Sequence, residues 1–147
     1  TDAERTAARS TAVPGTSEHQ MGLAADIIDI HYPQLNEKQA SRPTQKWLME
    51  HCWEYGFILR YPEDKSELTG IIYEPWHYRY VGVEAAQAIR EQGLCLEEYL
   101  QWRAQYQSAV AWAWEKGITA SATVEGFAPQ STCTRAQLVT FLHHALT

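Results

Sequence analysis

The stretch between Gly56 and Gly82 restricts the fold more strongly than any other part of the sequence. Short segments rich in β-branched and aromatic residues, at 57–61, 70–73 and 76–81, are separated there by Pro62-Glu63-Asp64-Lys65 and by Glu74-Pro75. Short segments of this composition with Pro-containing breaks between them are typical of strands that pair in sequence order. We therefore predict a small antiparallel meander that ends at Gly82.

Another strand and several helices are predicted around these segments. The alternation of apolar and acidic residues over 23–30 predicts a strand. Apolar residues at helical spacing, with Pro and Gly at the ends, predict helices at 2–11, 43–55, 83–92, 96–105 and 108–116 and a last one that begins at Thr134. The predicted class is α+β, a small antiparallel sheet with flanking helices that is followed by a short helical module.

Composition narrows the classes of partner. The chain has 147 residues, about one domain's worth, and 45% hydrophobic residues, enough for a packed core. Its formal net charge of −6, without a basic stripe, argues against a nucleic-acid partner. Because the longest apolar run, 22–30, is short and interrupted by Asp26 and Asp29, we expect no membrane span.

The composition changes after about Gln101. We place a module boundary between Trp102 and Tyr106, which divides the chain into domains at 1–103 and 104–147. The second part, about 45 residues, is near the lower size limit for independent folding.

The cysteines support neither a zinc ribbon nor a dense disulfide framework. Cys52, Cys95 and Cys133 are odd in number and form no Cys-x-x-Cys pair. For Cys52 and Cys95 we favour small buried apolar residues, and a bridge between them stays open as the alternative.

Two segments combine residue types that bind metal ions. His19 is on a predicted loop and Asp26 follows seven residues later on the predicted strand, with small residues between them, so both can converge on one ion. In Glu74-Pro75-Trp76-His77, His77 can supply a third ligand, and Glu74 can approach the open position across the bend at Pro75. Three protein ligands plus water is the pattern of catalytic zinc.

Taken together, these segments resemble the VanY-type D-alanyl-D-alanine carboxypeptidases, zinc metallopeptidases of the group that includes lysostaphin-type endopeptidases and the hedgehog zinc domain. The family motifs Ser-x-His-x-x-Gly-x-Ala-x-Asp and Glu-x-x-His are matched without a gap at Ser17, His19, Gly22, Ala24, Asp26, Glu74 and His77. Segments at 14–19, 55–62 and 73–82 are also similar, and the resemblance covers about residues 1–100.

This resemblance implies that His19, Asp26 and His77 hold Zn²⁺ on the sheet and that Glu74 is the general base. The implied reaction is hydrolysis of the terminal D-Ala-D-Ala peptide bond of peptidoglycan stem peptides. A related peptidoglycan endopeptidase or an LD-carboxypeptidase is the alternative within the same class of enzyme.

The family also carries an upstream Ser-x-Tyr-Arg segment and a Gln that help to bind the terminal carboxylate. Because this sequence begins after such a segment, we expect an N-terminally truncated domain. A catalytically incomplete protein that binds the cell wall is therefore a further alternative.

Substrate contacts are predicted for Ser17, Arg60 and Trp76. Ser17 is at the edge of the ligand loop, where a turn or cap role fits equally well. Arg60 can bind the terminal carboxylate of the substrate in a bidentate pair. An equally good alternative is that Arg60 pairs with a group of the protein itself and has a structural role. For Arg79 we favour a structural partner, and for Trp76 a packing role that shapes the site.

The tail resembles an S-layer homology repeat at 109–119, 127–129 and 134–137. Such repeats anchor proteins to cell-wall polysaccharide, and one copy is present. A helical hairpin that packs on the first domain is the alternative. Both resemblances imply a location outside the cell, at the bacterial cell wall.

Overall fold

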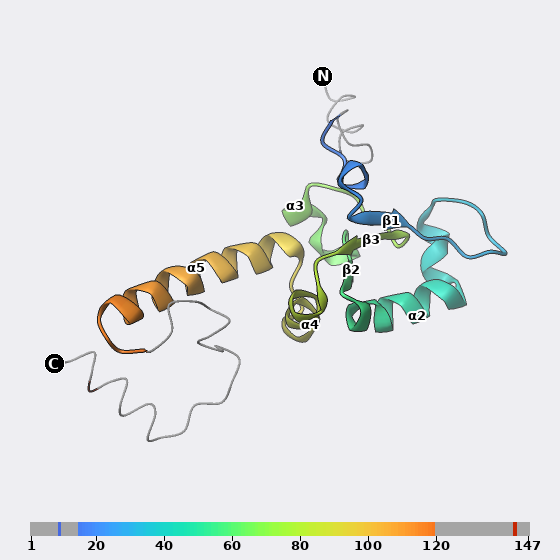
Figure 1. Ribbon diagram of the computed structural model, residues 1–147. Coiled ribbons are helices and arrows are strands. Elements are labelled where there is room, and N and C mark those ends of the chain that lie inside the picture. Colours follow the sequence, from blue (N-terminus) through green and yellow to red (C-terminus); the bar gives the residue numbers. More distant parts are fainter. Residues whose placement is uncertain (1–8, 10–14, 120–142, 144–147) are drawn as a thin grey trace. The chain divides into compact units, whose positions relative to one another are not determined.

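The computed structural model describes residue 9, residues 15–119 and residue 143 (Figure 1). The predicted helix that begins at Thr134 lies outside the described residues apart from residue 143, and so does the predicted helix at 2–11 apart from residue 9. Cys133 also lies outside them. The chain divides into two compact units, 1–97 and 98–147, and each is described by itself. No described helix is long and apolar enough to cross a membrane.

The first unit contains most of the described elements. In chain order, with η for a 3-10 helix, they are η1 (Glu18–Met21), β1 (Ala24–Asp26), η2 (Glu37–Ser41), α2 (Pro43–His51), η3 (Cys52–Tyr55), β2 (Phe57–Leu59), η4 (Glu63–Lys65), α3 (Ser66–Thr69), β3 (His77–Tyr80) and α4 (Val83–Gln92). Helix α5 (Leu96–Glu115) begins at the end of this unit.

The three strands form an antiparallel sheet in the order β1-β3-β2, which Figure 1 shows as the short arrows of the first unit. Asp26 of β1 pairs with His77 of β3, and Leu59 of β2 pairs with Tyr78. Tyr78 is completely buried, and its hydroxyl donates a hydrogen bond to the Gln45 side chain at 2.8 Å. The predicted α+β class with a small antiparallel sheet is confirmed.

The predicted strand at 70–73, and with it the meander, is wrong. This segment is irregular backbone after α3, and Ile72 is exposed. Both edges of β3 are occupied, by β1 and β2, so a strand at 70–73 has no place beside it. The central strand is therefore flanked by a segment from much earlier in the chain, which sequence order does not reveal.

The predicted strand at 23–30 is shortened to Ala24–Asp26. Beyond Asp26, the backbone N–H of Ile27 donates to the Trp76 carbonyl, and that of Asp29 donates to the Gln39 side chain. The first bond continues the register of the β1–β3 ladder by one residue, whereas the second goes to a side chain outside the sheet, so strand pairing ends after Ile27.

The helices at 43–55 and 83–92 form as predicted, with one refinement. Residues 43–55 are α2 followed by the 3-10 turn η3, which ends at Gly56 with φ +81°. Helix α4 ends at Gly93. In Figure 1 both α2 and α4 lie below the sheet, and α4 contacts β2.

The core of the first unit contains both described cysteines. Cys52 and Cys95 are buried among residues such as Ile58, Ala86 and Ile89, and no disulfide joins them. Burial raises the pKa of the Cys52 thiol to about 11, so this sulfur stays protonated. Both cysteines behave as small apolar residues, as favoured from the sequence.

Helix α5 is one continuous helix where two were predicted, at 96–105 and 108–116. The predicted module boundary at 102–106 therefore falls inside a helix, while the compact units separate at Glu97 and Glu98. Residues 100–110 contain neither Gly nor Pro, so nothing in the backbone chemistry ends the helix there.

Candidate metal centre

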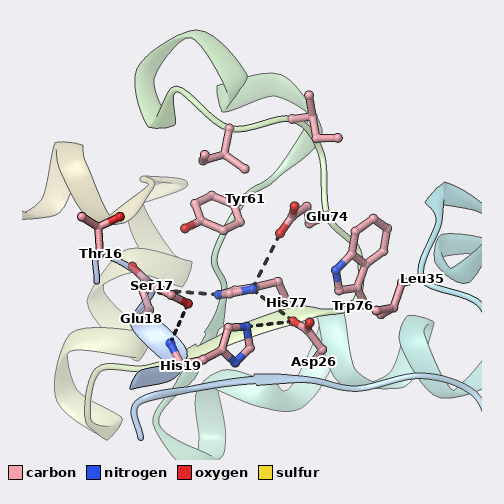
Figure 2. Close-up of a pocket in the computed structure, with 12 residues that line it drawn as sticks. Thr16, Ser17, Glu18, His19, Asp26, Leu35, Tyr61, Glu74, Trp76 and His77 are labelled. Atoms are coloured by element: carbon pink, nitrogen blue, oxygen red, sulfur yellow. Dashed lines mark hydrogen bonds and ion pairs between the residues drawn. The ribbon is translucent and has the colours of Figure 1, made fainter. Parts of the chain in front are cut away.

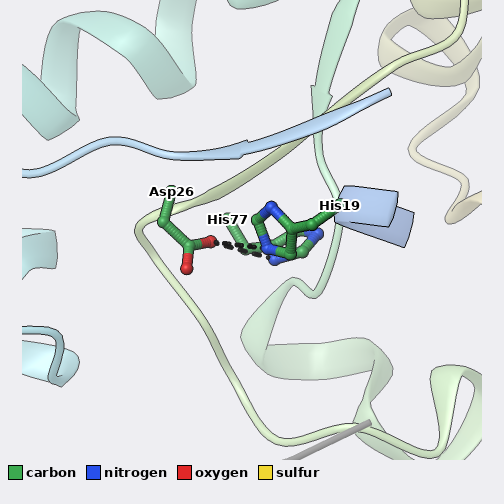
Figure 3. Close-up of side chains that lie close together, drawn as sticks. All are labelled: His19, Asp26 and His77. Carbon is green, nitrogen blue, oxygen red and sulfur yellow. Dashed lines mark ion pairs between the residues drawn. The ribbon is translucent and has the colours of Figure 1, made fainter. Parts of the chain in front are cut away.

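Three predicted ligands converge at one end of the sheet. Asp26 is the last residue of β1 and His77 the first of β3, and the two are directly paired in the ladder. His19 is in η1, and the left-handed turn at Gly22 (φ +67°) leads from η1 to β1. Figure 3 shows the three side chains gathered around a common point.

The distances from Asp26 to each of the two histidines fit one tetrahedral ion. His19 Nε2 is 3.4 Å from Asp26 Oδ1, and His77 Nδ1 is 3.1 Å from the same oxygen. Two ligands that bind one zinc ion at about 2.0–2.1 Å in tetrahedral geometry lie roughly 3.3 Å apart. All three ligand atoms lie within 4.8 Å of one another. Two imidazoles and one carboxylate are a donor set that suits zinc with an open position.

Glu74 lies beside this cluster. Its Oε2 is 3.6 Å from His77 Nδ1, and its backbone is held because its N–H donates to the Tyr61 carbonyl at 3.1 Å. The residue is buried, and this burial raises the pKa of Glu74 to about 7; the nearby His77 opposes the rise and the Asp26 charge adds to it. A carboxyl group with a pKa near neutrality can both accept and release a proton.

A cavity of about 490 Å³ opens in front of the cluster. Figure 2 shows Glu74 and His77 among the side chains that surround it, with Trp76 and Leu35 at one side. The lining residues are Thr16, Ser17, Glu18, His19, Asp26, Leu35, Tyr61, Ile71, Ile72, Glu74, Trp76 and His77. The predicted ligands, the predicted base and two of the three predicted substrate residues are thus brought together.

Ser17 and Trp76 line the cavity, but Arg60 does not. Ser17 also caps η1, because its Oγ accepts a hydrogen bond from the backbone N–H of His19 at 3.3 Å. The cap role is therefore present, and it places the hydroxyl at the cavity wall.

Arg60 is engaged by carboxylates of the protein itself. Its Nη1 and Nη2 donate to Glu97 at 3.1 and 2.6 Å, and its Nε donates to Glu18 at 2.8 Å. The guanidinium is buried, and burial alone would lower the pKa of Arg60. The hydrogen bonds and charges of Glu97 and Glu18 outweigh this effect, so the pKa of Arg60 is raised. The sequence left two roles open for Arg60, and the structure shows the structural one, in which Arg60 pairs with Glu97 and Glu18.

Sequence reasoning assigned no role to Glu18, which lines the cavity and lies beside His77. Burial alone would raise the pKa of Glu18, but hydrogen bonds from His77 and Arg60 and the charges of Arg60 and Arg79 lower it to about 2. The available signal was its location between Ser17 and His19, inside the first metal motif.

Comparison with known proteins finds a family match within the first unit. A family model described as VanY, D-alanyl-D-alanine carboxypeptidase, matches residues 1–83. A D-alanyl-D-alanine carboxypeptidase of Enterococcus faecalis is 57% identical over 91 residues, which are 60% of this chain and 31% of that protein.

Two solved structures extend the comparison to the fold. The LdcB LD-carboxypeptidase is 47% identical with a TM-score of 0.63, over 67% of this chain and 46% of that chain. A mutant of the vancomycin-resistance D,D-pentapeptidase VanY from a VanB-type cassette, in complex with Zn(II), is 52% identical with a TM-score of 0.58, over 67% of this chain and 53% of that chain. This chain thus spans about a third to a half of the length of these relatives. With the family model matching more than half of its residues, the chain belongs to the VanY D-alanyl-D-alanine carboxypeptidase family.

Proposed function

We propose that this chain carries the zinc-binding and proton-transfer groups of a carboxypeptidase that removes the terminal D-alanine from peptidoglycan stem peptides. His19, Asp26 and His77 would hold Zn²⁺, and Glu74 would be the general base. The observation that carries the proposal is the position of the buried Glu74 carboxyl, 3.6 Å from His77 Nδ1 at the edge of three converging ligands. The zinc complex of the VanY relative supports the choice of metal.

The chain's own groups fit peptide hydrolysis. When bound, zinc lowers the pKa of a coordinated water and polarises the scissile carbonyl. Glu74, beside the ligand cluster, is in position to accept a proton from the attacking water and to return it to the leaving amine. Ser17 and Trp76 line the cavity in which the stem peptide would lie.

A second candidate is an LD-carboxypeptidase, which the similarity to LdcB favours. The same zinc and base would act, and the difference would lie in the residue that precedes the scissile bond. The S-layer homology-like repeat at 104–147, its cell-wall polysaccharide partner and a location at the cell wall remain proposals that rest on the sequence. A wall-binding protein without hydrolysis is the outcome that a negative activity test would favour.

The test is release of D-alanine from a muramyl pentapeptide and from a tetrapeptide, measured with zinc content on the chain and on Glu74→Gln. We expect release from the pentapeptide, and a loss of about 10²–10⁴-fold in Glu74→Gln with zinc retained, because that change removes proton transfer alone. Release from the tetrapeptide only would select the LD-carboxypeptidase. Zinc-loaded protein without release from either peptide would reject the proposal.

A further inference from the structure

The two carboxylate oxygens of Glu18 have different partners. Oε1 accepts the hydrogen bond from Arg60 Nε at 2.8 Å and lies 3.4 Å from Arg79 Nη1. Oε2 lies 3.4 Å from Nε2 of His77. Only 16% of the Glu18 side chain is exposed, so water competes little for either oxygen. One oxygen is therefore committed to the arginines and the other faces the imidazole.

His77 presents its two nitrogens to different groups. Nδ1 faces Asp26 and Glu74, at 3.1 and 3.6 Å, whereas Nε2 faces Glu18. The two nitrogens of an imidazole point away from each other, so Glu18 cannot bind the same ion as Nδ1. A neutral imidazole has one N–H and one lone pair, and a ligand at Nδ1 needs its N–H at Nε2. Glu18 is the acceptor in place for that N–H.

Glu18 is itself held in position. Arg60 is buried and anchored by its two hydrogen bonds to Glu97, so its Nε–H is directed at Glu18 from a fixed position. The ring of Tyr61 stacks against the same guanidinium, which lies 4.7 Å from the ring centroid. The chain of contacts thus runs from Glu97 through Arg60 and Glu18 to His77.

We propose that Glu18 is a positioning residue, which holds His77 as the Nε2–H tautomer so that the lone pair of Nδ1 faces Asp26 and His19. Arg60 and Glu97 keep the Glu18 carboxylate in the required orientation. The inference rests on the proposed zinc function for its metal readout, whereas the tautomer of His77 can be measured without metal.

The isosteric change Glu18→Gln gives a sharp test. Arg60 and Arg79 only donate, so the amide oxygen of the new side chain is drawn to them and its NH₂ group is left facing His77. Nε2 must then accept, which moves the ring proton to Nδ1, where it blocks the metal. A residue that only filled space would tolerate this change.

The tautomer is read from ¹⁵N–¹H correlation spectra of the metal-free protein labelled at histidine, at a pH where the ring is neutral. We expect His77 as the Nε2–H form in the unchanged chain and as the Nδ1–H form in Glu18→Gln. Zinc affinity, measured by chelator competition, should fall about 10–100-fold in the same variant. Glu54→Gln is the matched control, since Glu54 pairs at 2.7 Å with the partly exposed His51 and should leave zinc affinity and His77 unchanged.

Folded Glu18→Gln with His77 still in the Nε2–H form and unchanged zinc affinity would overturn the inference. If Glu18→Gln does not fold, Arg60→Lys serves instead, because it removes the fork that orients Glu18 and should also weaken zinc binding and mix the tautomers. Unchanged spectra and affinity in Arg60→Lys would then overturn it. If the unchanged chain shows the expected tautomer, lost in Glu18→Gln, but binds no zinc, the proposed function fails and the positioning role stands.

Discussion

At the scale of the residue, each nitrogen of His77 faces a carboxylate: Asp26 at Nδ1 and Glu18 at Nε2. His19, Asp26, Glu74 and His77 were predictable because metal chemistry restricts both their type and their spacing. Glu18 was not, because a charged residue next to a ligand on a loop is equally typical of exposed surface. Its role depends on Arg60, 42 positions away, whose direction only the fold defines.

Removing one ligand should abolish tight zinc binding. His19→Ala leaves two of three protein ligands, so zinc affinity should fall by more than the about 10–100-fold that loss of an outer hydrogen-bond partner costs. His51→Ala is the control, since this residue does not line the cavity. Metal content after dialysis measures the effect, and equal zinc in the two variants would contradict the assignment of His19.

At the scale of the element, patterns with a local cause were predictable. Helix α2 begins at Pro43, the 3-10 turn η3 that follows it ends at Gly56, and α4 ends at Gly93. The strand order was not predictable, because β3 is bordered by β1, a segment far back in the chain. The segment at 70–73 has strand-like composition, but β3 has no edge left to pair with it.

Gly56 should be intolerant of a side chain. Its φ is +81°, and a Cβ there would lie 2.8 Å from Cε2 of Tyr80 and 3.0 Å from the backbone of Gly82 and Val83. Gly70 (φ +73°) has the same kind of backbone with nothing within 4 Å. Both Ala variants lose about 1–2 kcal/mol to the left-handed conformation, and Gly56→Ala should lose about 1–3 kcal/mol more through the clash. Urea unfolding measures the difference, and equal losses would argue against close packing at Gly56.

Asp29 should make the fold sensitive to acid. The backbone N–H of His31 donates to its carboxylate and lowers the pKa of Asp29; burial opposes this, and the Thr44 hydroxyl and the Arg42 charge lower the pKa further. Because the folded pKa lies below the unfolded value of about 3.9, the contribution to stability is complete above that value and is lost as pH falls through the folded pKa.

The measurement is the free energy of unfolding of the unchanged chain and of Asp29→Asn at neutral and at acid pH. The variant should be less stable at neutral pH, and the difference should shrink in acid. Asp64→Asn, at an exposed position, is the control and should show no such convergence. A difference for Asp29→Asn that stays constant with pH would show that its charge does not matter.

For the whole molecule, the division into units places every predicted ligand and the base in residues 1–97. The predicted boundary at 102–106 followed a change of composition, which falls within the continuous helix α5 a few residues after this division. The assignment of 104–147 as a separate module remains a prediction.

Zinc should stabilise the folded chain as a whole. An ion that binds only the folded state adds about 2.7 kcal/mol at a concentration 100-fold above its Kd. The melting temperature should therefore fall when a chelator is added, and His77→Ala should show no such dependence. A melting curve of the unchanged chain that the chelator does not move would oppose this expectation.

The position of a bound metal is the most direct evidence on whether the three residues form a zinc site. An anomalous difference map of zinc-loaded crystals would locate the ion. We expect one peak about 2.0–2.2 Å from His19 Nε2, an Asp26 carboxylate oxygen and His77 Nδ1. A peak bound to Nε2 of His77, or one that leaves out any of the three residues, would contradict this expectation.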